Sequence, residues 1–301
     1  GSESDKSLKA LAEKISPMGS KFSNDILLNS KLFDKIKYVY NNKDMDNLDE
    51  QDLRLIDVTY KRFVRNGADL NEEKKEIIRK IDEELSLLSP KFSNNVLNAQ
   101  NKFELWVDDE KKLEGLPESS ITMAKEEAKQ KDQENKWLFT LQYPSMGPFL
   151  SYAKNRELRK HLFLAYGSLC NNDEFSNNDI IKKIVELKHK RANLLGFDNF
   201  ADYVLDDRMA GNVKNVYKLL DDLYNNCYEK AKVELNELKD FAKKLDGIED
   251  FKPWDQSYYF TKLQKEKFDI DSEMLRPYFK AENVIDGIFK VANKMYGIKF
   301  K

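Results

Sequence analysis

The sequence predicts an all-α fold, and the scarcity of chain breakers and the spacing of apolar residues both point to it. Of the 301 residues, only 11 are glycine and 7 are proline. Apolar side chains recur every three or four residues over long stretches, which is the period of an amphipathic helix. Hydrophobic residues make up 41% and charged residues 35% of the chain, enough for a sizeable core under a strongly solvated surface. We expect long antiparallel helices, with at most a small β-hairpin around residues 137–142.

The first half of the chain shows two clear helical stretches. Residues 49–66 carry one apolar face and are followed by Gly67, a typical helix stop. Asn71 is placed to cap the next helix, and Glu72 and Glu73 in its first turn suit the positive end of the helix dipole. The apolar stripe of that second helix is formed by Ile77, Ile78, Ile81, Leu85 and Leu88.

Pro90 interrupts this second stretch, because it lacks a backbone N–H and restricts the residue before it. We expect a kink or break near Ser89. The helical pattern then resumes with Phe92, Val96, Ala99, Phe103 and Trp106, and Gly115-Leu116-Pro117 ends it.

The second half alternates further helices with one candidate strand. Residues 120–133 predict a short amphipathic helix, and residues 137–141 are the best strand candidate, bounded by Pro144 and Gly147. Helices are expected over 156–169, 178–195, 213–245, 254–265 and 283–295. Cys227 lies in the apolar stripe of the long helix 213–245, which predicts a buried thiol. Ile298-Lys299-Phe300 has the character of a strand that has just begun.

The chain shows no linker rich in glycine, serine or proline and no fixed-period repeat. We therefore expect one helical region over residues 3–301. Gly1-Ser2 is typical of the remnant of a removed expression tag. If so, the natural protein extends beyond the sequence given.

Charge and cysteine content exclude several classes of protein. Lys and Arg number 51 against 53 Asp and Glu, so the formal net charge is 51 − 53 = −2. A dedicated nucleic-acid binder shows a basic excess. No apolar run approaches the roughly 18 residues of a membrane span. The two cysteines, Cys170 and Cys227, have no metal-ligand or disulfide spacing and are expected to be buried, reduced thiols. This low cysteine use favours a cytoplasmic location.

Histidine is equally scarce, with only His161 and His189 in the chain. A zinc hydrolase helix carries two histidines four residues apart with a glutamate between them, and neither histidine has such neighbours. A Cys–His nucleophile pair stays an open alternative, since a cysteine and a histidine distant in sequence can meet in space, but it has no local signature here. The sequence also contains no glycine-rich phosphate loop and no nucleophile elbow. Its adjacent acidic pairs are typical of solvated helix faces.

One aromatic cluster stands out, Pro253-Trp254-Asp255-Gln256-Ser257-Tyr258-Tyr259. Pro253 and Asp255 suit the first turn of a helix. The rings of Trp254, Tyr258 and Tyr259 fit two interpretations, packing at a helix start or an aromatic wall beside a peptide groove. Arg208, which precedes the helix 213–245, is a second candidate for contact with a peptide channel.

Read in order, these pieces resemble the thimet-oligopeptidase and peptidyl-dipeptidase family of zinc metallopeptidases, with the bacterial peptidyl-dipeptidase branch nearest. The resemblance runs from about Ser16 to Phe300. The motifs that carry it are Ser16-Pro17-Met18, Asn29–Asp34, Leu55-Ile56-Asp57, Phe63–Ala68, Phe92–Leu97, Leu113–Pro117, Tyr143-Pro144-Ser145, Arg156–Arg159, Leu194–Phe197, Arg208-Met209-Ala210, Pro253-Trp254-Asp255 with Tyr258-Tyr259, Leu275–Phe279 and Val284–Phe289.

The resemblance implies an amino-terminal, non-catalytic portion of such an enzyme. In the family, the zinc helix and the groups that stabilise the transition state follow the segment that ends here, so no catalytic or metal-binding residue carries over to this chain. Zinc and the catalytic half would then belong to the parent protein, and that half would be this chain's partner. The end at Ile298–Phe300, in mid-element, favours this interpretation.

The family's architecture implies that this chain forms one wall of a deep channel whose narrow opening admits short unfolded peptides. The parent enzyme would release dipeptides from carboxyl termini or cut oligopeptides internally. The face near Trp254, Tyr258 and the 284–295 helix is expected to be unusually apolar or self-associated, because it would meet the missing half. The alternative is a stand-alone helical scaffold that binds peptides or proteins without cutting them.

Overall fold

The computed structural model describes residues 6–43, 48–171, 173–269 and 272–300. It confirms the all-α class: helices follow one another along the chain, and the described strands are two short ones. Gly1-Ser2, the expected tag remnant, lies outside the described residues. None of the helices in the described ranges is long and apolar enough to cross a membrane.

The chain forms two compact units, each built from two separate stretches of sequence. Unit 1 comprises residues 1–99 and 169–226, and unit 2 comprises residues 100–168 and 227–301. The sequence shows no linker because the chain passes between the units partly within helices. Two long helices, α4 (Glu72–Lys102) and α10 (Val213–Asp246), each belong to both units.

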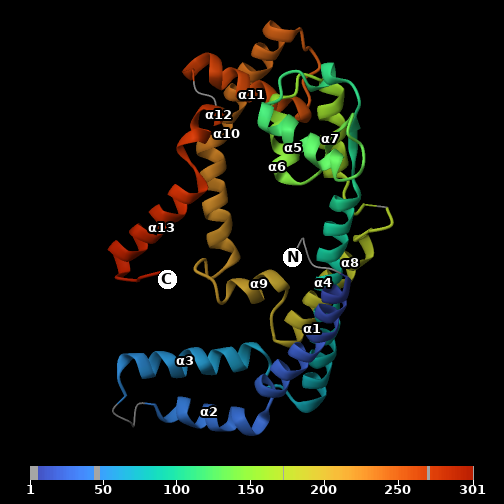
Figure 1. Ribbon diagram of the computed structural model, residues 1–301. Coiled ribbons are helices and arrows are strands. Elements are labelled where there is room, and N and C mark those ends of the chain that lie inside the picture. The colour runs from blue at the N-terminus through green and yellow to red at the C-terminus, as the bar shows by residue number, and fades with distance from the viewer. Residues whose placement is uncertain (1–5, 44–47, 172, 270–271, 301) are drawn as a thin grey trace. The chain divides into compact units, whose positions relative to one another are not determined.

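In unit 1, α1 (Lys6–Leu27) precedes an antiparallel pair formed by α2 (Ser30–Asn42) and α3 (Glu50–Arg65), which lie side by side (Figure 1). Most of α4, then α8 (Asn178–Leu194), α9 (Phe200–Leu205) and the start of α10 complete the unit. Its α2–α3 core contains Phe33, whose ring stacks on Tyr60 and Phe63 at centroid distances of 5.8 and 6.3 Å.

Short polar caps explain where the helices of unit 1 begin. The side chains of Asn29, Asp49 and Asn71 accept the backbone N–H three residues further on, at 3.0, 2.8 and 2.9 Å. This confirms the predicted cap at Asn71. Gly67 ends the α3 turn with φ +96°, a conformation that a residue with a Cβ adopts only under strain.

Unit 2 begins with the end of α4 and continues with β1 (Leu105–Val107), a 3-10 turn (Glu110–Leu113), α5 (Glu118–Lys129), β2 (Trp137–Phe139), α6 (Tyr143–Tyr152) and α7 (Arg156–Gly167). The rest of α10 follows, with α11 (Pro253–Phe268), α12 (Ser272–Leu275), a 3-10 turn (Arg276–Tyr278) and α13 (Ala281–Tyr296). Helix α11 packs against α6 and α7, and α5 packs against β2.

The predicted strand at 137–141 exists, but its partner is distant. β2 pairs antiparallel with β1, with Trp106 opposite Leu138, so the expected small β element around 137–142 is present, but its partner is residues 105–107 and not the next segment of chain. Trp106 therefore lies in a strand, although the pattern had placed it in a continuing helix. The helix ends at Lys102, since beyond it the chain reaches more burial by pairing with β2.

Pro90 does not break α4, which runs unbroken from Glu72 to Lys102. A proline inside a helix costs roughly 3 kcal/mol through the lost N–H and the crowded preceding turn. Packing on both sides of the proline offsets this cost: Ile78 and Ile81 are buried before it and Ala99 after it. Of the expected kink or break near Ser89, the break is therefore wrong, and the kink stays a prediction.

The apolar faces of the last long helices are exposed. Leu219, at 61% exposure, is typical of the α10 stripe, and Cys227 in that stripe is exposed whereas Cys170 is buried. The expectation of two buried thiols is thus wrong for Cys227, because the described part of α10 is covered only near its carboxyl end, where Leu238 and Phe241 are buried against α11. Residues 298–300 do not form a strand; instead the ring of Phe300 stacks on Phe289, 4.3 Å between centroids.

Candidate functional site

The aromatic cluster predicted from the sequence opens helix α11 in unit 2. Pro253 occupies the first turn, where a missing N–H has no cost. The Asp255 carboxylate accepts the backbone N–H of Lys252 at 3.0 Å, and the Asp255 N–H donates to the Lys252 carbonyl at 2.9 Å. These residues thus determine where α11 begins, and the side chain of Asp255 is buried in the protein interior.

Asp255 is the centre of a buried ion-pair network that joins α11 to α7. Arg156 binds it in a bidentate manner, with Nε and Nη2 donating at 2.9 and 2.7 Å. Arg159 donates from Nη2 at 3.1 Å. The side chain of Asp255 is 0% exposed and that of Arg159 is 1% exposed, so the opposite charges compensate each other away from water.

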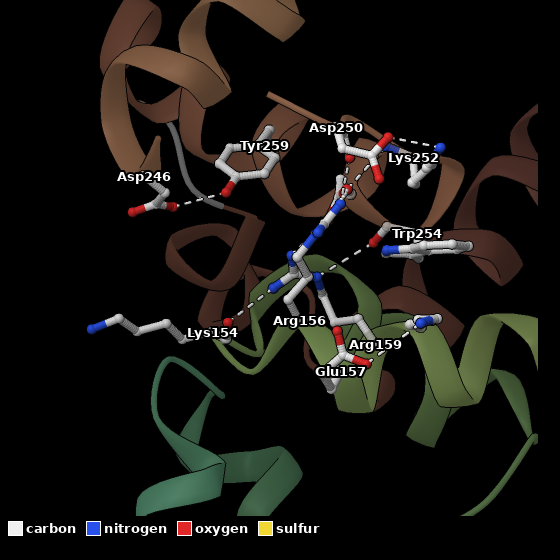
Figure 2. A network of polar contacts seen from close by, with 11 residues as sticks. Lys154, Arg156, Glu157, Arg159, Asp246, Asp250, Lys252, Trp254 and Tyr259 are labelled. Carbon is white, nitrogen blue, oxygen red and sulfur yellow. Dashed lines mark hydrogen bonds and ion pairs between the residues drawn. The ribbon is translucent and has the colours of Figure 1, made fainter. Parts of the chain in front are cut away.

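Both arginines also hold backbone carbonyl groups. Arg159 donates to the carbonyl oxygens of Ala153 at 2.7 Å and Trp254 at 3.3 Å, and Arg156 donates to that of Asp250 at 2.6 Å (Figure 2). These bonds fix the loop before α7 and the loop before α11. Because every charge in the network is paired, Asp255 has no role available as an acid or base, and the network serves to hold the two helices together.

The charges around Asp255 also set its pKa. Burial of the carboxylate raises the pKa, but hydrogen bonds from Arg156, from the backbone N–H of Lys252 and from Arg159 outweigh burial and lower the pKa below its ordinary value of 3.8. Asp255 is therefore ionised at neutral pH.

The two tyrosines of the cluster are buried core residues. The Arg159 guanidinium lies 4.1 Å from the ring centroid of Tyr258, and the rings of Tyr258 and Tyr259 meet edge to face at 5.0 Å. The Tyr259 hydroxyl donates to Asp246 at 3.0 Å (Figure 2). Burial, reinforced by Asp246, raises the pKa of Tyr259 far above its ordinary value. Both rings thus contribute packing, and a role in lining a peptide channel stays a prediction.

Trp254 differs from these tyrosines because its side chain is only partly buried. Its ring meets Phe163 edge to face at 6.3 Å, and Lys160 Nζ lies 5.6 Å from its centroid. The indole N–H is buried and has no acceptor in the described part of the chain. Buried donors are nearly always paired in native proteins, so Trp254 retains one unused hydrogen bond.

Arg208, the fourth predicted contact, belongs to unit 1. It is exposed and lies between α9 and α10, where its carbonyl accepts the N–H of Gly211 at 2.9 Å. The structure therefore gathers Trp254, Tyr258 and Tyr259 in one cluster and places Arg208 in the other unit.

A second polar network, which the sequence analysis did not identify, holds unit 1 together. Arg191 on α8 donates to Asp82 at 2.7 Å, to the Tyr203 hydroxyl at 3.2 Å and to Asn66 Oδ1 at 3.3 Å. Arg65 pairs with Asp206 and donates to the Tyr203 carbonyl at 2.8 Å. These bonds connect α3, α4, α8 and α9.

The residues needed for a zinc site are not assembled in the described part of the chain. His161 lies in unit 2 and His189 in unit 1, and both are exposed. Among the residues that the structure describes, no group of three or more His, Cys, Asp or Glu could hold a metal ion. The donor chemistry of these residues therefore does not fit a catalytic zinc.

Comparison with known proteins places the chain among peptidases. Residues 149–301 match the sequence profile of peptidase family M3. Over 299 residues the chain is 35% identical to the organellar oligopeptidase A (chloroplastic/mitochondrial) of Arabidopsis thaliana, covering 97% of this chain and 38% of that protein. It is 32% identical to the dipeptidyl carboxypeptidase of Escherichia coli, covering 97% of this chain and 43% of that protein.

The oligopeptidase A of Escherichia coli is also 32% identical, over 98% of this chain and 44% of that protein. Both branches of the expected family thus match with the same identity in this bacterium. The chain spans about two fifths of the length of these relatives. Since the family profile matches half of the chain, this chain belongs to peptidase family M3, the thimet-oligopeptidase and peptidyl-dipeptidase family of metallopeptidases.

Proposed function

We propose that this chain forms a non-catalytic wall of the substrate channel of a zinc-dependent oligopeptidase or peptidyl-dipeptidase. The observation that carries the proposal is the combination of family membership with a donor set that does not fit zinc. The chain spans about two fifths of relatives named for peptide cleavage. The hydrolytic chemistry would then come from a part of the protein outside this sequence, and this chain would restrict access to short unfolded peptides.

The exposed faces of the last helices support the proposal. On α10, Leu219, Leu220 and Leu223 are all more than half exposed. On α13, Ile285 and Ile288 are likewise exposed, as we expected for the 284–295 helix. Exposed apolar surface of this kind usually marks a protein contact, and the occupant that we propose for each of these two faces is the catalytic half of the same polypeptide.

Among the four predicted channel residues, Trp254 is the best suited to contact a peptide. Its ring is partly exposed and can pack against a bound peptide, whereas its indole N–H is buried. Tyr258, Tyr259 and Arg208 stay proposed channel contacts. The two tyrosines are less suited to this role than Trp254 because their rings are used in packing, and Arg208 belongs to the other unit. The proposal covers both endopeptidase and dipeptidyl-carboxypeptidase action, and a cytoplasmic location is part of it.

An activity assay on the purified chain tests the proposal. We expect no stoichiometric zinc by elemental analysis and no cleavage of a quenched fluorescent peptide above the buffer rate, because no described residues assemble a metal site. Oligopeptidase A of Escherichia coli, assayed beside it, is the positive control. Cleavage by the 301-residue chain that zinc restores and a chelator abolishes would show that the chain carries its own catalytic centre.

A further inference from the structure

Unit 2 contains a pocket whose lining includes none of the residues at the start of α11. Its volume is about 340 Å³, and it lies between the end of α4, helix α5, strand β2 and the start of α6. Phe103, Met123 and Leu138 provide apolar surface, whereas the rest of the lining is mostly polar. This size is at the lower end of the range for small-molecule sites.

The charged residues of the pocket leave one carboxylate uncompensated. Glu104 pairs with Lys131 and accepts the indole N–H of Trp106 at 2.9 Å. The hydrogen bond from Lys131 is the main cause that lowers the pKa of Glu104 below its ordinary value. Glu127 on α5 is exposed and has no ion pair within the described ranges. Two acidic residues against one lysine give the lining a net charge of 1 − 2 = −1, which favours a cation.

The amide groups of the pocket are already oriented. Gln142 Nε2 donates to Asn101 Oδ1 at 2.9 Å, which leaves the side-chain carbonyl oxygen of Gln142 free to accept. Nearby, the Thr140 N–H donates to Ser145 Oγ at 3.0 Å and fixes that hydroxyl. A carboxylate and an amide oxygen that line the same pocket suit a primary ammonium, which carries three donors and no acceptor.

We propose that this pocket binds a primary ammonium carried on a short apolar chain, with Glu127 as the counter-ion. The apolar chain would lie on Met123 and Leu138, and the ammonium would face Glu127 and Gln142. Two sources share this chemistry, the amino-terminal residue of a short peptide and a simple alkylamine. The site is independent of the channel-wall proposal, because its residues all lie in unit 2 and need neither zinc nor a further part of the polypeptide.

The test is a saturation-transfer NMR titration of the 301-residue chain with L-leucinamide at pH 6.5, where an α-amino group is protonated. We expect saturable binding that the Glu127→Gln variant weakens by up to about five-fold, since an ion pair at an accessible site contributes at most roughly that factor. Glu126→Gln is the matched control: it removes the same charge from the same helix but lies outside the pocket, and binding should be unchanged.

Two further ligands complete the experiment. N-acetyl-L-leucinamide, which lacks the ammonium, should not bind. Tighter binding of leucinamide than of n-butylamine assigns the site to a peptide amino terminus, and the reverse assigns it to an alkylamine. Equal binding by the acetylated compound, or equal affinities of Glu127→Gln and Glu126→Gln, would overturn the proposal, as would the absence of saturable binding of both amines.

Discussion

Replacement of Asp255 by asparagine is expected to lower the free energy of unfolding of unit 2 by about 3–5 kcal/mol. The variant keeps the shape of the side chain but removes its charge, so Arg156 and Arg159 lose their common counter-ion. Arg159 is the more sensitive of the two because it is 1% exposed. Removal of one partner from a buried ion pair leaves the other charge uncompensated away from water.

Urea denaturation followed by tryptophan fluorescence measures this effect, because Trp106, Trp137 and Trp254 all belong to unit 2. Asp250→Asn is the matched control: its carboxylate pairs with Lys252 at 2.7 Å but is 72% exposed. For Asp250→Asn we expect the free energy of unfolding to change by no more than about 0.5 kcal/mol. If Asp255→Asn shifts the transition no more than Asp250→Asn does, the network does not hold α7 to α11.

The contribution of Asp255 to the free energy of unfolding should decrease as the pH is lowered. Its pKa in the folded chain is below the ordinary value of 3.8. The carboxylate therefore stabilises the fold fully above about pH 4 and loses this contribution as the pH falls through its folded-state pKa. The difference in stability between the unaltered chain and Asp255→Asn should accordingly shrink below about pH 4.

The second large effect is expected in unit 1, where Arg191→Met should lower the free energy of unfolding by about 2–4 kcal/mol. Methionine retains much of the side-chain volume but cannot donate to Asp82, Tyr203 or Asn66. The Arg191 side chain is 11% exposed and that of Asp82 is 18% exposed, so the groups left behind are shielded from water.

Unit 1 contains no tryptophan, so hydrogen exchange of the α8 amides, read by mass spectrometry, is the suitable measurement. Lys183→Met is the matched control, because Lys183 joins the same two helices through Glu84 at 3.3 Å. That pair is 41% and 44% exposed and should contribute less than about 1 kcal/mol. Equal protection of α8 in both variants would contradict the role given to Arg191.

Periodicity and caps were sufficient to predict most helices. The stretch predicted as 213–245 is α10, Val213–Asp246, since a long apolar stripe is unambiguous when it spans nine turns. Asn71 and Gly67 marked helix ends correctly because their roles depend on local backbone geometry alone.

Other features depend on contacts that periodicity does not report. Trp106 continued the helical spacing from Phe103, yet its position is decided by pairing with Leu138, a residue far along the chain. The apolar stripe of α10 showed that one helix face is apolar, but it did not show whether another element covers that face. For this reason Cys227 was predicted to be buried, although it is exposed.

The candidate site was predictable only in part. The sequence singled out the start of α11, but it did not show that Asp255 meets two arginines from α7, because the partners are 99 and 96 residues apart. Arg156 and Arg159 share one helix face at a spacing of three, which was the available signal. The pocket beside Glu127 combines four elements and has no signature along the chain.

The central claim is that this chain is the channel wall of a metallopeptidase whose zinc site lies elsewhere in the same polypeptide. Reading the coding sequence downstream of the Lys301 codon tests it most directly. We predict an open reading frame that continues into a helix with two histidines four residues apart and a glutamate after the first, the HExxH pattern of zinc hydrolases. A stop codon without that pattern would contradict the account and would favour a stand-alone binding scaffold.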